Sequence, residues 1–260
     1  MNFRGGRGGG GWPHLVKHIA KAGSSDYAEL RRKAREEAEA RNASPELVSA
    51  SDLTRLDRWK TDRHPTLAAR EALKDALANA TEERPMQVVL ENHPSLLAHM
   101  ITGNHRTWVR PQVQFGNHYM ADFLIAGRTS VGLRWILVEL ESPTHRLTNP
   151  GNHRASPALR HAVDQIEDWR QWLTSNLAYA RAPRDSDGLG LPGITADARG
   201  LIIIGREDSS DSASEIRDTQ FRNSRIEVRT YDWLLRAAED IHSLEWGLFD
   251  IEIGVDEDDW

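Results

Sequence analysis

An amphipathic helix between two apolar strands is the feature that most limits the fold of this chain. The segment Arg134–Glu141 begins as an apolar strand pattern, and Leu201–Ile204 reads LIII. Between them, Pro157–Ala178 repeats apolar residues at helical spacing, which is typical of a helix with one buried face. A short, fully apolar strand is expected at the centre of a sheet. The pattern therefore predicts a strand–helix–strand unit around one sheet.

Further strands and helices surround this unit. Trp108–Phe115 and His118–Ile125 alternate as strands do, Gly127–Gly132 is rich in turn residues, and Ile226–Thr230 is a last strand pattern. Helices are predicted at 65–80, at 85–100 with a break at Pro94, from after the LIII strand to 223, and at 232–244. This order predicts an α/β (α+β) fold with a mixed sheet flanked by helices, preceded by a helical N-terminal segment that includes a charged helix at 26–43.

Composition excludes several classes of site. The chain has no cysteine, which rules out disulfides, thiolate zinc sites and a cysteine nucleophile. The net charge of −6 means that any nucleic-acid binding needs a local basic patch. No apolar run approaches the roughly 20 residues of a membrane helix, and the N-terminus lacks the apolar core of a signal peptide. We therefore expect a cytoplasmic protein that does not enter a membrane.

Two carboxylates end the strand at 134–141. Successive strand side chains point to opposite faces, so Glu139 and Glu141 share one face with Leu137. The turn before this strand centres near Thr129–Ser130, which places Asp122 of the preceding strand across from Glu139 to within about one pleat repeat. The sequence therefore predicts a cluster of three carboxylates at one end of the sheet.

Crowded carboxylates repel one another, and burial raises the cost. Basic partners relieve this repulsion, and so does a divalent cation such as Mg²⁺ or Mn²⁺, which prefers oxygen ligands and can activate water for attack on phosphorus. From spacing alone, a metal site and a solvated or arginine-paired strand end remain about equally good interpretations. Gln165 lies at the edge of the apolar stripe on the 157–178 helix, from where it could reach over the strand ends, although a polar residue at such a position is more often a boundary residue.

Several motifs, taken in order, resemble one family. The chain resembles the C-terminal nuclease domain of the Shedu anti-phage defence proteins, in the PD-(D/E)xK nuclease superfamily, from about Thr81 to about Leu244. The resemblance implies a Mg²⁺-dependent or Mn²⁺-dependent DNA endonuclease that acts on phage or foreign DNA and assembles as a homo-oligomer, with a tetramer suggested. The matching motifs are MQVVLENHPSLL, ADFLI, ILVELESP, LRHAVDQIEDWRQWL, GLIIIGRE and IEVRTYDWLL.

The resemblance also implies roles for single residues. Asp122 matches the metal-binding Asp of the motif, although Ala121 replaces the usual Pro, and Glu139 matches the acidic metal ligand. Glu141 stands where the superfamily usually has Lys, although some restriction endonucleases with Glu there are active. Gln165 matches the glutamine on the helix after the motif. The predicted catalytic residues are thus Asp122, Glu139, Glu141 and Gln165, the first three also binding the metal.

Basic residues near this site predict contacts with the DNA backbone. Arg146 and Arg154 lie in the polar loop after the active strand, and Arg206 matches the Gly-Arg of the family. For each, a surface loop or salt bridge is an equally good interpretation.

The resemblance divides the chain into four parts. We predict a disordered Gly/Arg-rich leader at 1–11, a helical region at 12–80, the nuclease-like domain at 81–245 and an acidic tail at 246–260. The replacements at Ala121 and Glu141 support an alternative function, in which the nuclease fold has lost cleavage and binds DNA or a protein partner. A cleavage assay separates the two.

Overall fold

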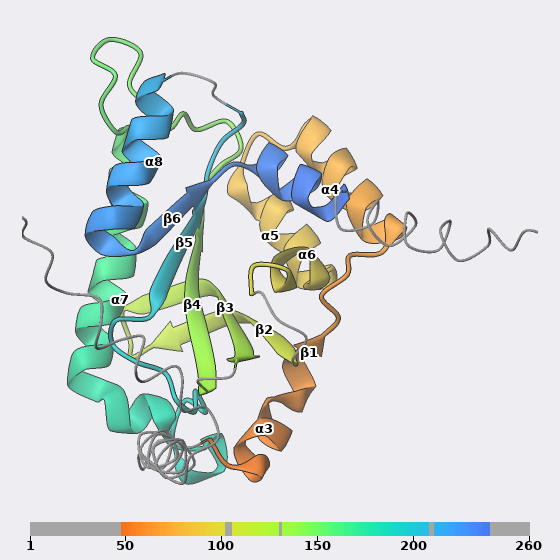
Figure 1. The fold of residues 1–260 in the computed structure, drawn as a ribbon, viewed down its shortest axis with the longest axis vertical. Coiled ribbons are helices and arrows are strands. Elements are labelled where there is room, and N and C mark those ends of the chain that lie inside the picture. Colours follow the sequence, from red (N-terminus) through yellow and green to blue (C-terminus); the bar gives the residue numbers. More distant parts are fainter. Residues whose placement is uncertain (1–47, 102–105, 130–131, 208–210, 240–260) are drawn as a thin grey trace, which may run out of the picture. The chain divides into compact units, whose positions relative to one another are not determined.

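A mixed sheet with helices on both faces forms the centre of the molecule (Figure 1). The computed structural model describes residues 48–101, 106–129, 132–207 and 211–239. Within them, the predicted α/β fold class is confirmed. The predicted leader at 1–11, the helix at 26–43 and the tail at 246–260 lie outside the described residues.

The six strands follow one another across the sheet in chain order. Neighbours from β1 to β4 are antiparallel, whereas β5 pairs in parallel with both β4 and β6. The predicted strand–helix–strand unit is therefore the step from β4 to β5, which a helix connects. The strands are β1 (Lys60–Thr61), β2 (Thr107–Phe115), β3 (Tyr119–Thr129), β4 (Gly132–Leu140), β5 (Arg199–Ile203) and β6 (Ile226–Arg229).

The helices divide between two cores, one on each face of the sheet. The first core contains the apolar stripe of α7 with residues of α3 and α8. The second contains residues of α4, α5, α6 and the helix at 231–239. Among the described helices, none has the length and apolar character required to cross a membrane. The bounds are α3 (Ala50–Leu56), α4 (Leu67–Asn79), α5 (Glu83–Asn92), α6 (Ser95–Ala98), α7 (Pro157–Arg181) and α8 (Asp211–Ser224), with the short 3-10 helices η1 (Asp57–Trp59) and η2 (Arg184–Ser186).

Local sequence explains where these helices begin and end. The Ser156 hydroxyl accepts the Leu159 N–H and caps α7, with Pro157 in the first turn. In the same way, Thr66 caps α4. The predicted break at Pro94 is confirmed, because α5 ends before this residue and α6 begins after it.

Two local predictions were wrong. The region predicted as helical before residue 63 contains β1, a two-residue strand that pairs with Thr107 and Trp108 and lies in the same compact unit as the rest of the sheet. The segment Gly127–Gly132, predicted as a turn, consists mostly of paired strand residues, since β3 continues to Thr129 and β4 begins at Gly132. In both places, cross-strand pairing outweighs the local preference of the residues.

Gly205 joins the end of β4 to the end of β5. Its backbone is left-handed, with φ +65°, and a Cβ at this position would lie 2.1 Å from the carbonyl oxygen of His145. Its N–H donates to the Ser142 carbonyl, and its own carbonyl accepts the Tyr231 N–H. A glycine is therefore required where the chain leaves β5 and passes the loop after β4.

Replacing Gly205 tests this junction. We expect Gly205→Ala to lower the free energy of unfolding by more than about 2 kcal/mol, because it adds a left-handed backbone cost to a steric clash. Gly151→Ala is the matched control, since nothing lies within 4 Å of a Cβ built there. Urea denaturation of both variants measures the difference. Equal stability of the two variants would contradict the assigned role of Gly205.

Candidate functional site

The predicted pairing of Asp122 with Glu139 agrees with the strand register. Phe123 pairs with Val138, so the next opposed positions along the hairpin are Asp122 and Glu139. The Leu140 N–H donates to Asp122 Oδ2 at 2.8 Å. Along β4, Leu137 belongs to the core beneath α7, whereas Val138 and Leu140 belong to the opposite core. The alternation inferred from the pleat is therefore present in the structure.

Asp122 and Glu139 share a hydrogen bond in a largely buried setting. Glu139 is 6% exposed. Burial raises the pKa of Glu139 to about 10, and the carboxylates of Asp122, Glu83 and Glu141 add to this rise. Burial also raises the pKa of Asp122 to about 6, although the Leu140 N–H and the Glu139 carboxyl favour its charged form. Glu139 therefore keeps a proton and donates it to the Asp122 carboxylate.

Glu141 is held by different contacts. Its Oε2 lies 2.9 Å from Nδ1 of His145. Its backbone N–H donates to the Ile203 carbonyl of β5, and its carbonyl accepts the Tyr231 hydroxyl at 2.9 Å. The carboxylates of this cluster, after burial itself, raise the pKa of Tyr231. Glu141 thus lies beside the Asp122–Glu139 pair with its side chain turned to an imidazole.

Helix α5 adds acidic and amide groups that the sequence interpretation did not assign to the site. Burial, followed by the charges of Asp122 and Glu141, raises the pKa of Glu83 to about 7, against an opposing effect of His145. The charge of Glu91 also raises the pKa of Asp122. Between them, Gln87 is 3% exposed and donates to Glu91 at 2.8 Å. The four-residue spacing of Glu83, Gln87 and Glu91 along one helix face was the signal that could have found them.

A cation fits this site only in part as it stands. Within the described residues, no three His, Asp or Glu side chains are arranged so that they could hold a metal ion together. The Asp122 and Glu139 carboxyls contact each other, whereas the Glu141 carboxylate is taken up by His145. Two buried oxygen donors with water and substrate phosphate are a usual Mg²⁺ environment. Of the three predicted metal ligands, Asp122 and Glu139 are thus the two that could hold Mg²⁺ or Mn²⁺, and Glu139 would first have to lose its proton.

Gln165 lies on α7 between buried residues, as its place at the edge of the stripe predicts. Its neighbours Ala162 and Ile166 are fully buried, and Gln165 itself is half-buried. Among the described residues it makes no hydrogen bond that ties it to Asp122, Glu139 or Glu141. The structure thus gives Gln165 no contact with the carboxylates, and its role stays a prediction.

The loop after β4 presents two of the predicted DNA-binding arginines. Arg146 and Arg154 are exposed, and neither pairs with a carboxylate in the described part of the chain. The loop is built as a hairpin, since Thr148 bridges to Ala155 and the Asn149 N–H donates to the Arg154 carbonyl. These arginines therefore project from an ordered support.

Arg206 has a different environment. Its guanidinium donates to both oxygens of Asp232 at 2.8–3.0 Å, and to the Leu77 carbonyl at 3.3 Å. This fork-to-carboxylate geometry ties the end of β5 to the helix at 231–239. The ion pair that the sequence left open as an alternative is the arrangement present.

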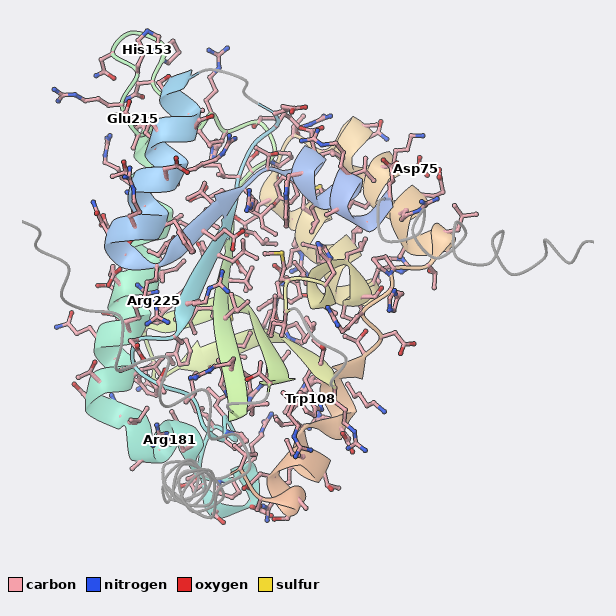
Figure 2. The ribbon with its side chains drawn as sticks, in the orientation of Figure 1. Asp75, Trp108, His153, Arg181, Glu215 and Arg225 are labelled. Atoms are coloured by element: carbon pink, nitrogen blue, oxygen red, sulfur yellow. The ribbon has the colours of Figure 1, made fainter. Side chains whose placement is uncertain are left out.

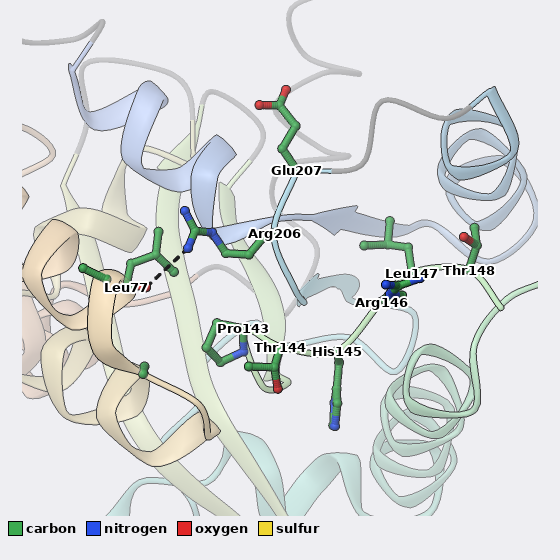
Figure 3. A pocket seen from close by; sticks show the side chains of 11 residues that line it. Leu77, Pro143, Thr144, His145, Arg146, Leu147, Thr148, Arg206 and Glu207 are labelled. Carbon is green, nitrogen blue, oxygen red and sulfur yellow. Dashed lines mark hydrogen bonds between the residues drawn. The ribbon is translucent and has the colours of Figure 1, made fainter. Parts of the chain in front are cut away.

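A pocket of about 610 Å³ is lined by His145, whereas Asp122, Glu139 and Glu141 do not line it (Figure 3). It lies between the end of α4, the loop after β4 and the residues after β5, and His145 connects it to Glu141. Figure 3 shows the Arg206 side chain reaching across toward Leu77. The lining residues are Leu77, Ala78, Ala80, Pro143, Thr144, His145, Arg146, Leu147, Thr148, Arg206 and Glu207.

Comparison with known proteins identifies one family. The model of the family described as Shedu protein SduA, C-terminal, matches residues 80–235, which is more than half of the chain and contains every part of the carboxylate cluster. No curated protein matches the chain. This match confirms the resemblance drawn from the motifs. The chain therefore belongs to the Shedu SduA C-terminal family, and membership in this family implies a role in anti-phage defence.

Proposed function

We propose that the chain is a divalent-metal-dependent DNA endonuclease that hydrolyses phosphodiester bonds of phage or foreign DNA. The observation that carries this proposal is the buried Asp122–Glu139 carboxyl pair at the end of β4. The neighbouring Glu141 contacts His145, which lines a pocket that Arg146 also lines. Burying two acids against each other is costly unless a cation or a shared proton offsets the charge. A nuclease site accounts for the two buried acids, because its metal ion would offset their charge.

The residues of the site divide the chemistry among them. Asp122 and Glu139, with the Leu140 carbonyl, would hold Mg²⁺ or Mn²⁺. When bound, the cation supplies a water of lowered pKa and offsets the charge that develops on the phosphate. Glu141 accepts a proton from the attacking water, and its contact with His145 orients that carboxylate. Gln165 positions a water or a phosphate oxygen.

The DNA approaches along the pocket beside this cluster. Arg146 and Arg154 contact backbone phosphates, which positions the strand without reading its sequence. The proposal includes a homo-oligomer, possibly of four copies as the family resemblance suggests, in the bacterial cytoplasm. These partners follow from the family and from the chemistry of the site.

Cleavage of DNA tests the proposal. We expect Glu139→Ala to reduce cleavage of plasmid DNA with Mg²⁺ by roughly a thousandfold, because the loss of a metal ligand removes several kcal/mol of transition-state stabilisation. EDTA should abolish cleavage by the wild type. Glu215→Ala, which removes an exposed acid on α8, is the matched control and should cleave normally.

Failure of the wild type to cleave with Mg²⁺ or Mn²⁺ would overturn the nuclease proposal. If the wild type binds DNA or a protein partner under those conditions without cleaving DNA, the inactive binding module is favoured. Glu141 in place of Lys is the feature that supports this alternative. Equal cleavage by wild type and Glu139→Ala would instead overturn the assignment of the site.

The raised pKa of Glu139 predicts how the free energy of unfolding depends on pH. Because the pKa of Glu139 rises from 4.5 to about 10 on folding, the folded state binds more protons than the unfolded state between these values. The stabilisation that protonated Glu139 contributes is thus fully present below pH 4.5, and it decreases as the pH rises toward 10. Glutamine cannot ionise, so it does not lose this contribution as the pH rises. At pH 8 without metal, we expect the free energy of unfolding of Glu139→Gln to exceed that of the wild type by at least about 1 kcal/mol.

Thermal denaturation of both proteins across this pH range, in EDTA and in MnCl₂, checks the sign. The wild type should gain stability from Mn²⁺ and Glu139→Gln should gain less. A metal-free wild type whose stability rises from pH 5 to pH 9 relative to Glu139→Gln would contradict the buried acid pair.

Binding measurements separate the roles of the three arginines. We expect the double variant Arg146→Ala/Arg154→Ala to bind DNA more weakly and to lower the salt dependence of binding by about one unit per lost phosphate contact. Arg206→Ala should mainly reduce thermal stability, because it breaks the Asp232 pair. Arg222→Ala, an exposed arginine on α8, is the control. An unchanged salt slope in the double variant would exclude the loop from the DNA interface.

A further inference from the structure

A second cluster of arginines surrounds Trp59, apart from the carboxylates. A pocket of about 200 Å³ lies here, between the end of α3 with η1 and the turn that follows α7, and we call it the Trp59 pocket. It is far smaller than the pocket beside the candidate site. Its lining residues are Arg55, Arg58, Trp59, Arg184, Asp185 and Gly190.

Behind this pocket lies a buried arginine. Arg110 of β2 is only 8% exposed. Its Nη1 donates to the Leu189 carbonyl at 2.6 Å, and its guanidinium carbon lies 4.6 Å from the centre of the Trp59 ring. A carbonyl and a ring face stabilise a cation less than a carboxylate does, so burial here is incompletely compensated.

The surrounding charges add to the imbalance. Arg58 also lies over Trp59, at 4.7 Å. Burial lowers the pKa of Arg110 to about 10, and the cations of Arg184 and Arg58 lower it further. Arg55 is paired with Asp52 and Asp185. In the part of the chain that the structure describes, Arg58, Arg110 and Arg184 have no carboxylate partner.

The Trp59 ring, which lines the pocket, contacts the guanidinium groups of both Arg58 and Arg110, whereas Arg110 itself does not line the pocket. A guanidinium that lies over an aromatic ring keeps N–H donors at its edge for an anion. Arginine forks match the oxygens of phosphate in this way. The arrangement thus combines unpaired positive charge with oriented donors around a small cavity.

We propose that the Trp59 pocket binds a phosphate group, carried by a free di- or triphosphate or by a nucleic-acid backbone. Its volume admits one or two phosphate groups and no folded partner. Binding supplies a counter-ion to Arg58 and Arg184, which line the pocket, and offsets part of the positive charge that Arg110 adds beside Trp59. The bound phosphate stabilises the junction of α3, β2 and the turn after α7.

This phosphate is not the one proposed to be cleaved. Helix α7 begins beside the loop after the carboxylates and ends next to the Trp59 pocket, where the Leu189 N–H donates to the Tyr179 carbonyl in its last turn. Before its kink at Asn176, its residues 157–175 alone span roughly 28 Å at ~1.5 Å per residue. Figure 2 shows His153 of the loop and Arg181 of the helix end at opposite ends of this helix. The proposal therefore holds whether or not the carboxylate site cleaves DNA.

Calorimetric titration of the full chain in EDTA tests the pocket without metal at the other site. Pyrophosphate and a single-stranded oligonucleotide lacking terminal phosphates are the two probes. We expect Arg58→Ala and Arg184→Ala each to weaken binding about tenfold or more, since each loses a charge-assisted contact. Both side chains are exposed, so the fold is retained, and Arg222→Ala on α8 should bind like the wild type.

Loss of pyrophosphate binding in both pocket variants, but not in the control, supports a free phosphate ligand. The same pattern with the oligonucleotide alone supports a nucleic-acid backbone. Absence of binding by either probe, or equal affinity of the pocket variants and the wild type, would overturn the proposal.

Discussion

The carboxyl groups of Asp122 and Glu139, buried against each other, are the constraint on which the rest of the structure depends. They come from adjacent antiparallel strands, so a slip of the β3–β4 hairpin by one residue would turn one of them to the other face. The Leu140 N–H, donated to Asp122, reinforces that register at the last position of β4. Apolar residues on both sides of the strands supply the stability that offsets the burial of two acids.

Around this pair, the two faces of the sheet contribute different groups. Helix α5 packs in the core opposite α7 and brings Glu83, Gln87 and Glu91 toward the strand ends. Tyr231 binds the Glu141 backbone from the helix that follows β6. The site is thus assembled from segments separated by more than half of the matched region, and its charge balance depends on the packing of both cores.

Much of this arrangement follows from the sequence, because periodicity and pleat are local properties. The alternation along ILVELE and the expected turn placed Asp122 opposite Glu139 to within about one pleat repeat, and the strand register centres the hairpin one residue later than predicted. The pairing of Glu141 with His145 was not predictable, since side-chain rotamers depend on neighbours from other elements. Nor was β1, whose two residues form a strand only because β2 offers an open edge. The contacts of Arg206 with Asp232 and of Arg110 with Trp59 likewise join positions distant in the chain, which no local pattern reports.

The bridge between Thr148 and Ala155 has a consequence for how such a protein can diversify. It closes the base of the loop after β4, so that the tip from Asn149 to Arg154 is anchored independently of Glu141 and His145. Insertions or exchanges of charge at the tip would alter what the molecule touches while leaving the carboxylates undisturbed. In the proposed nuclease, target choice and bond cleavage can therefore change separately.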